Sequence, residues 1–237
     1  MMLSKAKALK GYKLASLDGE IGAVKEFYFD DRHWTIRYLV VDTGNWLTGT
    51  KVLISPVSLV EVRRDEQNIV VKLTRKQIED SPSLESDKPV SRQFEEDYRG
   101  YYPFIVRDPE QWTESTHRHK KWDPHLRSTD DVTGHAVQAS DGEIGRVEDF
   151  IIDDQSWAIR YLIIDTGNWW PGRSVLVSPR WIERVSWTES KVFVNLPQEA
   201  IKQSPEYNDE SLLTRDYETG LHRHYNRQGY WVDDSAC

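Results

Sequence analysis

The sequence predicts a mainly β protein built from two small β-barrel domains, and three observations lead to this prediction. Residues 11–56 align with residues 134–179 without a gap at a constant offset of 123, and 25 of the 46 positions are identical. Within each copy, short runs rich in β-branched and aromatic residues alternate with turn signals, which is the pattern of strands. Hydrophobic residues make up 38% of the 237 positions and charged residues 30%. This balance favours two small domains with much surface over one domain with a deep core.

The duplication also gives the expected domain boundaries. The match continues more weakly to residues 81–82 and 204–205, and it returns where residues 92–95 (RQFE) align with residues 215–218 (RDYE). A unit of this length that occurs only twice indicates a duplicated domain rather than a solenoid. We expect a first barrel over residues 1–82, a polar linker that packs on the barrels over 83–132, a second barrel over 133–205 and a C-terminal extension over 206–237.

Turn signals divide each copy into six short strands, which predicts a small closed or nearly closed barrel, with an open two-layer arrangement as the alternative. Asp-Gly is a strong hairpin dipeptide because glycine tolerates positive φ and aspartate can cap the turn. The run Ile36–Val41 is close to continuously apolar and predicts a central strand. Short helices are expected after each barrel, with Thr74 as the N-cap of the first and Pro197 at the first position of the second. The turn residues expected to be structural are Asp18, Gly19, Gly22, Gly44, Asp141, Gly142, Gly145 and Gly167.

The run DGEIG…DD..W.IRYL..DTGNW..G..VL.SP, present twice, resembles the PRC-barrel family, which is named for the cytoplasmic domain of the photosynthetic reaction-centre H subunit. The chain is most similar to tandem PRC-barrel proteins of bacteria, which also match at residues 125–128 (HLRS), at Tyr101-Tyr102, and at Tyr225 and Tyr230-Trp231. The resemblance implies small barrels that dock onto proteins and assemblies. It brings no general catalytic activity, and a fold alone does not determine function.

The loop sequence DTGNW, which occurs in both copies, is the candidate interaction site. Its leading interpretation is structural, because aspartate caps the turn, glycine adopts the required φ and tryptophan folds back on the barrel rim. The alternative is an aromatic contact patch for a partner or for the other barrel, since tryptophan is a preferred interface anchor. The candidate residues are Asp42, Asn45, Trp46, Asp165, Asn168, Trp169 and Trp170.

Two further groups of side chains are potential metal ligands, but no metal site or other cofactor is predicted. The acidic turns lack EF-hand spacing, and Asp-Gly turn chemistry accounts for half of their acids. These acids are Asp18, Glu20, Asp30 and Asp31 in the first copy and Asp141, Glu143, Asp153 and Asp154 in the second. The His-Arg-His segments at 117–119 and 222–224 would place two rings on one side of a strand, but no second ligand cluster accompanies them. Solvated or stacking histidines are therefore expected. Arg37 and Arg160 lie in strands near Asp42 and Asp165, and cross-strand pairing is their expected role.

Charge and composition limit the classes of partner. The net charge of −8 falls entirely in residues 124–237, which carry 11 basic and 19 acidic side chains, so direct nucleic-acid binding is not expected. The single cysteine, Cys237, excludes an intrachain disulfide, and no signal peptide or membrane-spanning run is found, so a cytoplasmic location is expected.

No catalytic motif is present either. The sequence therefore predicts a non-enzymatic adaptor or assembly module with protein partners and a possible homo-oligomeric state. The alternatives are a peripheral relative of the reaction-centre H subunit at a membrane electron-transfer complex, a helper in ribosome or RNA-processing assembly, and a small-ligand or metal binder. The PRC-barrel family also includes the C-terminal domain of a bacterial ribosome-maturation factor. The membrane helix of the H subunit and the additional N-terminal domain of that factor have no counterpart in this sequence, so neither specialised role is carried over.

Overall fold

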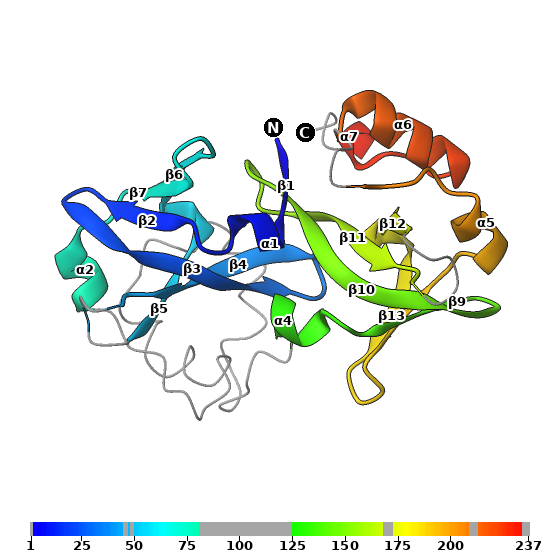
Figure 1. The fold of residues 1–237 in the computed structure, drawn as a ribbon, viewed down its shortest axis with the longest axis horizontal. Helices are drawn as coiled ribbons and strands as arrows, with labels where there is room; N and C mark the ends of the chain where they lie inside the picture. Colours follow the sequence, from blue (N-terminus) through cyan, green and yellow to red (C-terminus); the bar gives the residue numbers. More distant parts are fainter. Residues whose placement is uncertain are drawn as a thin grey trace. The chain divides into compact units, whose positions relative to one another are not determined.

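The computed structural model describes residues 2–44, 47, 50–80, 125–167, 173–208 and 213–233 (Figure 1). The chain divides into two compact units, which are described separately. The first-barrel unit contains residues 6–130 and 154–158, and the second-barrel unit contains residues 1–5, 131–153 and 159–237. Each unit thus combines most of one sequence repeat with short segments of the other. The predicted linker over 83–132 falls largely outside the described residues, and its boundaries stay a prediction.

The first-barrel unit is built on a seven-stranded sheet with the strand order β5-β4-β3-β2-β7-β6 and with β8 paired to β3. Neighbours on this path are antiparallel except β2 and β7, which are parallel. The strands are β2 (Lys13–Ser16), β3 (Gly19–Asp30), β4 (Thr35–Asp42), β5 (Lys51–Ile54), β6 (Leu59–Arg63), β7 (Asn68–Val71) and β8 (Leu126–Ser128). Two helices, α1 (Ala6–Leu9) and α2 (Arg75–Glu79), and the 3-10 turn η1 (Pro56–Ser58) accompany them.

The second-barrel unit repeats this topology with the order β12-β11-β10-β9-β14-β13 and with β1 paired to β10. Its strands are β1 (Leu3–Lys5), β9 (Ala136–Ala139), β10 (Gly142–Asp153), β11 (Ile159–Asp165), β12 (Ser174–Val177), β13 (Ile182–Ser186) and β14 (Lys191–Val194). The 3-10 turn η3 (Pro179–Trp181) and the helices α5 (Gln198–Lys202), α6 (Arg215–His224) and α7 (Tyr230–Asp233) follow. The helix α4 (Thr129–Val132) leads into β9.

Central strands that are apolar on both faces form the core of each unit. In β4, which lies between β3 and β5, the side chains of Leu39, Val40 and Val41 are at most 1% exposed. The corresponding residues of β11 are buried to the same degree. A strand that is buried on both faces reads as a continuous apolar run, which is why Ile36–Val41 was predicted to be central. The two similar β-sheets confirm the predicted mainly β fold of two duplicated barrels.

Each short helix is held by the aspartate of a distant hairpin turn. The carboxylate of Asp18 accepts a hydrogen bond from the backbone N–H of Arg75, the first residue of α2, at 2.7 Å, and α2 lies beside the β2–β3 hairpin in Figure 1. Thr74 is the N-cap of α2, as predicted, and forms a capping box with Gln77. This N-terminus therefore has two side-chain acceptors, one from its own segment and one from the hairpin.

The second helix, α5, differs at its first turn. Pro197 is its N-cap residue and makes no side-chain capping bond, so the prediction that it is the first helical residue was wrong by one position. A proline side chain carries no acceptor. The carboxylate of Asp141 accepts from the backbone N–H of Gln198 at 2.7 Å and supplies the missing acceptor.

Candidate functional site

The first DTGNW loop rises from a hydrogen-bonded base at the end of β4. The carboxylate of Asp42 accepts a hydrogen bond from the backbone N–H of Gly44 at 2.9 Å. The hydroxyl of Thr43 donates to the carbonyl of Thr50 at 2.7 Å, and the backbone N–H of Thr43 donates to the same carbonyl at 3.1 Å. The Gly44 N–H, together with the Lys25 ammonium 3.6 Å away, holds the pKa of Asp42 below its usual value. The two ends of the loop are thereby fastened to each other.

The second DTGNW loop has the same base. The carboxylate of Asp165 accepts from the backbone N–H of Gly167 at 2.8 Å. The hydroxyl of Thr166 donates to the carbonyl of Arg173 at 2.7 Å, and the Thr166 N–H donates to it at 3.2 Å. Aspartate and threonine therefore play the same roles at positions 123 apart.

A glycine of the preceding strand lies directly beneath each loop base. A Cβ atom on Gly22 would lie 2.0 Å from the carbonyl oxygen of Asp42, and one on Gly145 would lie 2.1 Å from the carbonyl oxygen of Asp165. Real Cβ atoms do not approach an oxygen this closely, so only glycine lets the loop base settle on the sheet. Gly145 also has a positive φ of 149°.

The structure thus describes the aspartates and glycines of the candidate site but not the rest of the loops. Asn45, Trp46, Asn168, Trp169 and Trp170 lie outside the described residues. Their role as interaction residues stays a prediction.

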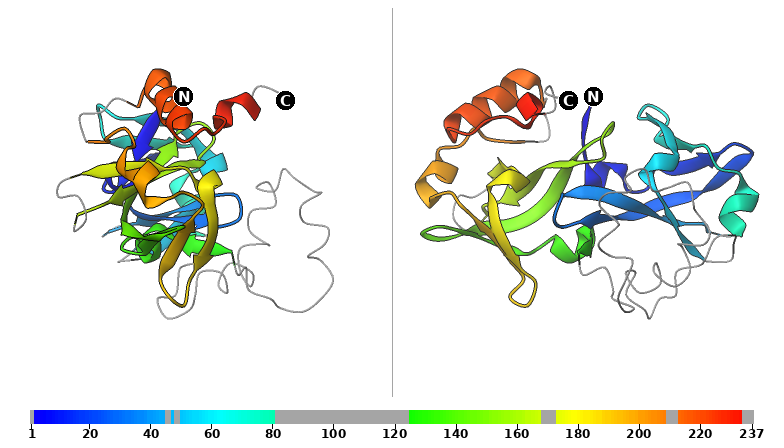
Figure 2. Two further views of the ribbon diagram at one scale, coloured as in Figure 1. Left: turned by 90° about the vertical axis from the view of Figure 1, so that its right-hand side faces the viewer. Right: turned by 180° about the vertical axis from the view of Figure 1, so that it is seen from behind.

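A second feature, which the sequence did not predict, is a buried polar network under α6 and α7. Glu218 is 1% exposed, and its Oε1 accepts hydrogen bonds from the hydroxyls of Tyr161 at 3.0 Å and Tyr230 at 2.8 Å. The guanidinium of Arg215 lies 3.1 Å from the other oxygen. Burial and the neighbouring carboxylate raise the pKa of both tyrosines, so both remain hydrogen-bond donors. The network ties α6 and α7 to β11, and Figure 2 shows the two helices close together.

The network continues to the end of β10. Asp153 is 1% exposed and accepts from Arg160 at 2.8 Å, and the Arg160 guanidinium lies 4.0 Å from the centre of the Tyr230 ring. In the first barrel the same strand position pairs Arg37 with Asp30 at 3.2 Å. Both arginines were predicted to make cross-strand pairs, and they do. Asp42 and Asp165, which lie five residues further along the same strands, are not the partners of these arginines, because they stand at the loop bases.

His222 lies within this network and contacts aromatic rings. Its Nε2 is 3.1 Å from the hydroxyl of Tyr161, and Nδ1 is 3.0 Å from the carbonyl oxygen of Gln228. The rings of Trp181 and Trp231 pack edge-on at 5.1 and 5.0 Å. Burial, together with nearby arginines, lowers the pKa of His222 although the Gln228 carbonyl favours the charged form. Of the two expected environments, solvated or stacking, this histidine is buried among aromatic rings, with edge-to-face rather than stacked contacts.

His224 does not share a face with His222. The segment 222–224 belongs to the helix α6 and not to a strand, so residues two apart point in different directions. The Nε2 of His224 bonds to the carbonyl of Ala200 at 2.7 Å instead. The geometry considered for a zinc pair is therefore wrong at 222–224, and the pair at 117–119 lies outside the described residues.

The acidic turns of the first barrel are occupied by protein partners. Asp30 accepts from the backbone N–H groups of Arg32 at 2.9 Å and His33 at 3.2 Å, and these bonds together with Arg37 outweigh the cost of burial and lower its pKa. Asp31 contacts His125 at 2.8 Å and accepts from Arg127 at 3.0 Å. Across the described ranges, no group of three His, Cys, Asp or Glu residues is placed to hold a metal ion.

A weak signal for the C-terminal network was present in the sequence. The match of residues 92–95 with 215–218 outside the barrel repeat includes an Arg-x-x-Glu pair, here Arg215 and Glu218. The partners of this pair, Tyr161 and Tyr230, are far away in the sequence. Sequence spacing alone could not connect them.

These features define a protein of two duplicated small barrels, each with the same loop base, and with a C-terminal helical cap on the second. The family model of the PRC-barrel domain matches residues 3–78 and 126–201, together more than half of the chain. The chain therefore belongs to the PRC-barrel domain family, and the resemblance inferred from DGEIG and DTGNW is confirmed. A comparison with curated proteins gives no match. Among the described residues, no helix has the length and apolar character needed to cross a bilayer.

Proposed function

We propose that this tandem PRC-barrel protein is a non-catalytic interaction or assembly module that binds protein partners through its two DTGNW loops. The observation that carries the proposal is the duplicated loop base. Asp42 and Asp165 cap the turn, and Thr43 and Thr166 close it through equivalent hydrogen bonds. A loop with a fixed base presents its tip at a low entropic cost of binding.

Two copies of one loop in a single chain also favour this function. If both loops engage one assembly, the second contact becomes intramolecular and the overall affinity rises without any new type of contact. The second loop carries Trp170 where the first carries Leu47, so the two tips differ in their apolar surface. This difference suits a module that contacts two related sites.

The surroundings of the buried acids support a structural role for them. Asp30, Asp153 and Glu218 each have an arginine as a partner, at 3.2, 2.8 and 3.1 Å respectively. Each of these carboxylates is therefore engaged by a basic group of the protein, as is expected of an acid that holds the fold together.

The test is quantitative affinity capture of the tagged full-length protein from its native cells. The test variant combines Trp46→Ala, Trp169→Ala and Trp170→Ala. The matched control combines Leu17→Ala and Val60→Ala, which remove apolar side chains that are 68% and 63% exposed and lie outside the loops. Circular dichroism and thermal unfolding first establish that both variants are folded.

The expected result is a set of partner proteins that is retained by the wild type and the control and depleted at least tenfold with the tryptophan variant. Equal recovery with all three proteins would exclude the loops as the binding site. Robust turnover by the wild type in hydrolase or transferase screens would contradict the non-catalytic assignment.

A further inference from the structure

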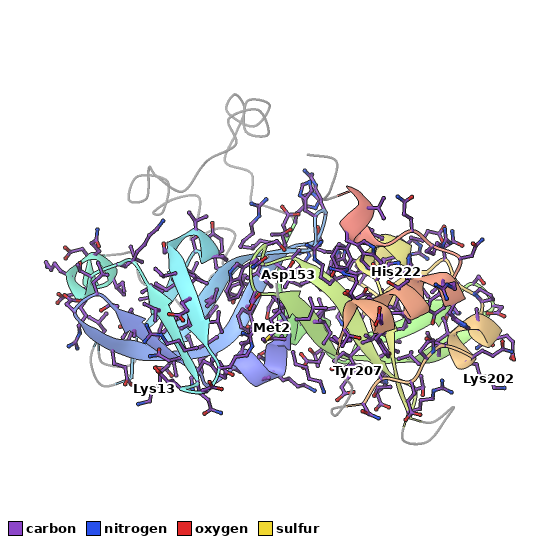
Figure 3. All side chains as sticks on the ribbon, turned by 90° about the horizontal axis from the view of Figure 1, so that it is seen from above. Met2, Lys13, Asp153, Lys202, Tyr207 and His222 are labelled. Carbon is purple, nitrogen blue, oxygen red and sulfur yellow. The ribbon has the colours of Figure 1, made fainter. Side chains whose placement is uncertain are left out.

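The first strand of each repeat pairs within the unit formed mainly by the other repeat. Strand β1 lies beside the end of β10, and strand β8 lies beside the end of β3. Figure 3 labels Met2, just before β1, and Asp153, at the end of β10. The paired residues are Leu3↔Asp153, Ser4↔Ile152 and Lys5↔Ile151 for β1, and Leu126↔Asp30, Arg127↔Phe29 and Ser128↔Tyr28 for β8. The two sets of pairs are equivalent under the repeat offset of 123, so that Leu3 corresponds to Leu126 and Asp153 to Asp30.

The exchanged strands belong to the family domain in sequence. The PRC-barrel family model begins at residue 3 in the first match and at residue 126 in the second, which are the first residues of β1 and β8. The strand that opens each domain along the chain is therefore donated to the other domain's barrel. The donation is reciprocal and uses the same register twice.

Side chains anchor β8 in the first-barrel unit. Arg127 donates to Asp31 at 3.0 Å, and the hydroxyl of Ser128 donates to Glu26 at 2.6 Å. Leu126 packs against the buried cluster that contains Tyr38. Ser128 itself is 4% exposed, so its bond to Glu26 is largely shielded from water, where it contributes more to stability than at the surface.

Strand β1 has a different set of anchors at the equivalent positions. Ser4 stands where β8 has Arg127, and Lys5 stands where β8 has Ser128. The Lys5 ammonium lies 5.3 Å from the centre of the Tyr207 ring in the same unit. The acid equivalent to Asp31 is Asp154, which belongs to the first-barrel unit and is bound there by Arg64 at 2.8 Å. The two donated strands therefore share one register but differ in their side-chain anchors.

We propose that this exchange makes the stability of each barrel depend on a strand that the other repeat encodes. Without its donated strand, the end of β3 or β10 becomes an open sheet edge with unpaired N–H and C=O groups on one side. Strand β3 or β10 of that barrel then lacks one pairing neighbour, while the strands of the other barrel keep all of their pairs. A substitution that disrupts the first strand of one repeat therefore lowers the stability of the barrel that the other repeat forms.

Proline substitution at equivalent positions of the full-length chain tests this proposal. The backbone N–H of Asp31 donates to the carbonyl of His125 at 2.8 Å. Along antiparallel strands, hydrogen-bonded pairs alternate with pairs that are not hydrogen-bonded. Because His125 and Asp31 form a hydrogen-bonded pair, the next such pair, two residues along, is Arg127 with Phe29. Arg127→Pro therefore removes a pairing N–H, and Ser4→Pro does so at the matching position of β1. Each variant is the matched control of the other.

Hydrogen exchange followed by mass spectrometry gives the readout in two peptide regions, residues 19–42 (β3–β4) and residues 142–165 (β10–β11). With Ser4→Pro we expect exchange about tenfold faster in β10–β11, equivalent to about 1.4 kcal/mol, and a change below about twofold in β3–β4. With Arg127→Pro we expect the opposite. If the proline variant at 127 does not fold, Arg127→Ala combined with Ser128→Ala removes the bonds to Asp31 and Glu26 and gives the same crossed pattern. Faster exchange in the repeat that carries the substitution, or equal acceleration in both regions, would overturn the proposal.

Discussion

Replacing Glu218 by alanine is expected to destabilise the second barrel strongly, because this residue joins the C-terminal cap to the sheet. Its Oε1 accepts hydrogen bonds from two buried hydroxyls, those of Tyr161 and Tyr230, which are 0% and 2% exposed. The alanine variant leaves both hydroxyls without this acceptor. It also removes the charge that pairs with Arg215.

The magnitude follows from the burial of these groups. The Tyr230 hydroxyl loses its acceptor, at a cost of about 1–3 kcal/mol. The Tyr161 hydroxyl keeps the Nε2 of His222 at 3.1 Å but loses its bond to a charged acceptor, at a cost of about 1–2 kcal/mol. Loss of the ion pair with Arg215 lowers the free energy of unfolding only a little, because the Arg215 side chain is 43% exposed and can turn towards water. Removing the buried carboxylate also removes its own desolvation cost, which offsets part of the loss. The expected net decrease in the free energy of unfolding is about 2–4 kcal/mol.

The variant Glu218→Gln keeps the shape of the side chain but removes its charge, so it measures the contribution of the charge to stability. Both tyrosines donate to the same oxygen of Glu218, so a glutamine amide oxygen can keep both bonds, whereas its NH₂ group cannot accept from Arg215 and that pair is lost. The bonds lose their charge assistance, and the expected decrease is about 1–2 kcal/mol. Guanidinium unfolding followed by circular dichroism and tryptophan fluorescence measures the free energies at a constant m-value.

Arg223→Ala is the control for these variants. Arg223 lies on the exposed side of the same helix, and its loss is expected to change stability by no more than about 0.5 kcal/mol. If Glu218→Ala is as stable as this control, the network does not hold the cap. If the glutamine and alanine variants are equally unstable, the reasoning from retained hydrogen bonds is refuted.

Three further predictions concern the glycines, a buried histidine and a helix cap. Gly22→Ala places a Cβ against the Asp42 carbonyl and should lower the free energy of unfolding by about 1–3 kcal/mol. Gly220→Ala, in α6 with open space around its Cα, should raise the free energy of unfolding by roughly 0.5–1 kcal/mol. Thermal unfolding distinguishes the two signs. Burial lowers the pKa of His135 below its usual 6.5, so the stability due to its neutral form is present above pH 6.5 and is lost as the pH falls through the lowered value. His135→Phe should therefore flatten the pH dependence of the unfolding midpoint in that window, and an unchanged slope would contradict the assignment. Asp141→Ala should cost about 1 kcal/mol and speed amide exchange in α5, and unaltered exchange there would show that the cap is dispensable.

The sequence predicted those parts of the fold that depend on local chemistry. The Asp-Gly dipeptide at residues 18–19 predicted a hairpin from glycine's conformational freedom and the capping ability of aspartate. The near-continuous apolar run Ile36–Val41 predicted a strand with two buried faces, and Thr74 predicted a helix start three residues before Gln77. In each case, the information needed lies within a few residues of the element.

The parts that were not predicted depend on contacts between distant residues. Asp18 was expected to act within its turn, but its carboxylate also caps α2, which begins 57 residues later. The partner of Arg160, Asp153, could not be identified from the sequence, because a cross-strand partner depends on register and bulges, and the β10–β11 pair contains two register shifts. The strand exchange has no local signal, since Leu126–Ser128 would pair equally well by composition with a strand of its own repeat.

The two copies also show which positions the shared barrel constrains and which it leaves free. The loop base and the glycine beneath it are repeated, because hydrogen bonds and a 2.0 Å Cβ approach leave no other choice. The exposed positions of η1 and β6 differ, with Val57 and Val60 in the first barrel and Arg180 and Glu183 at the same places in the second. An exposed position carries little stability, so its chemistry can change without harm to the fold. The same barrel sequence thereby carries chemically different surfaces in its two copies, which is the property that the proposed assembly module with two related contacts requires.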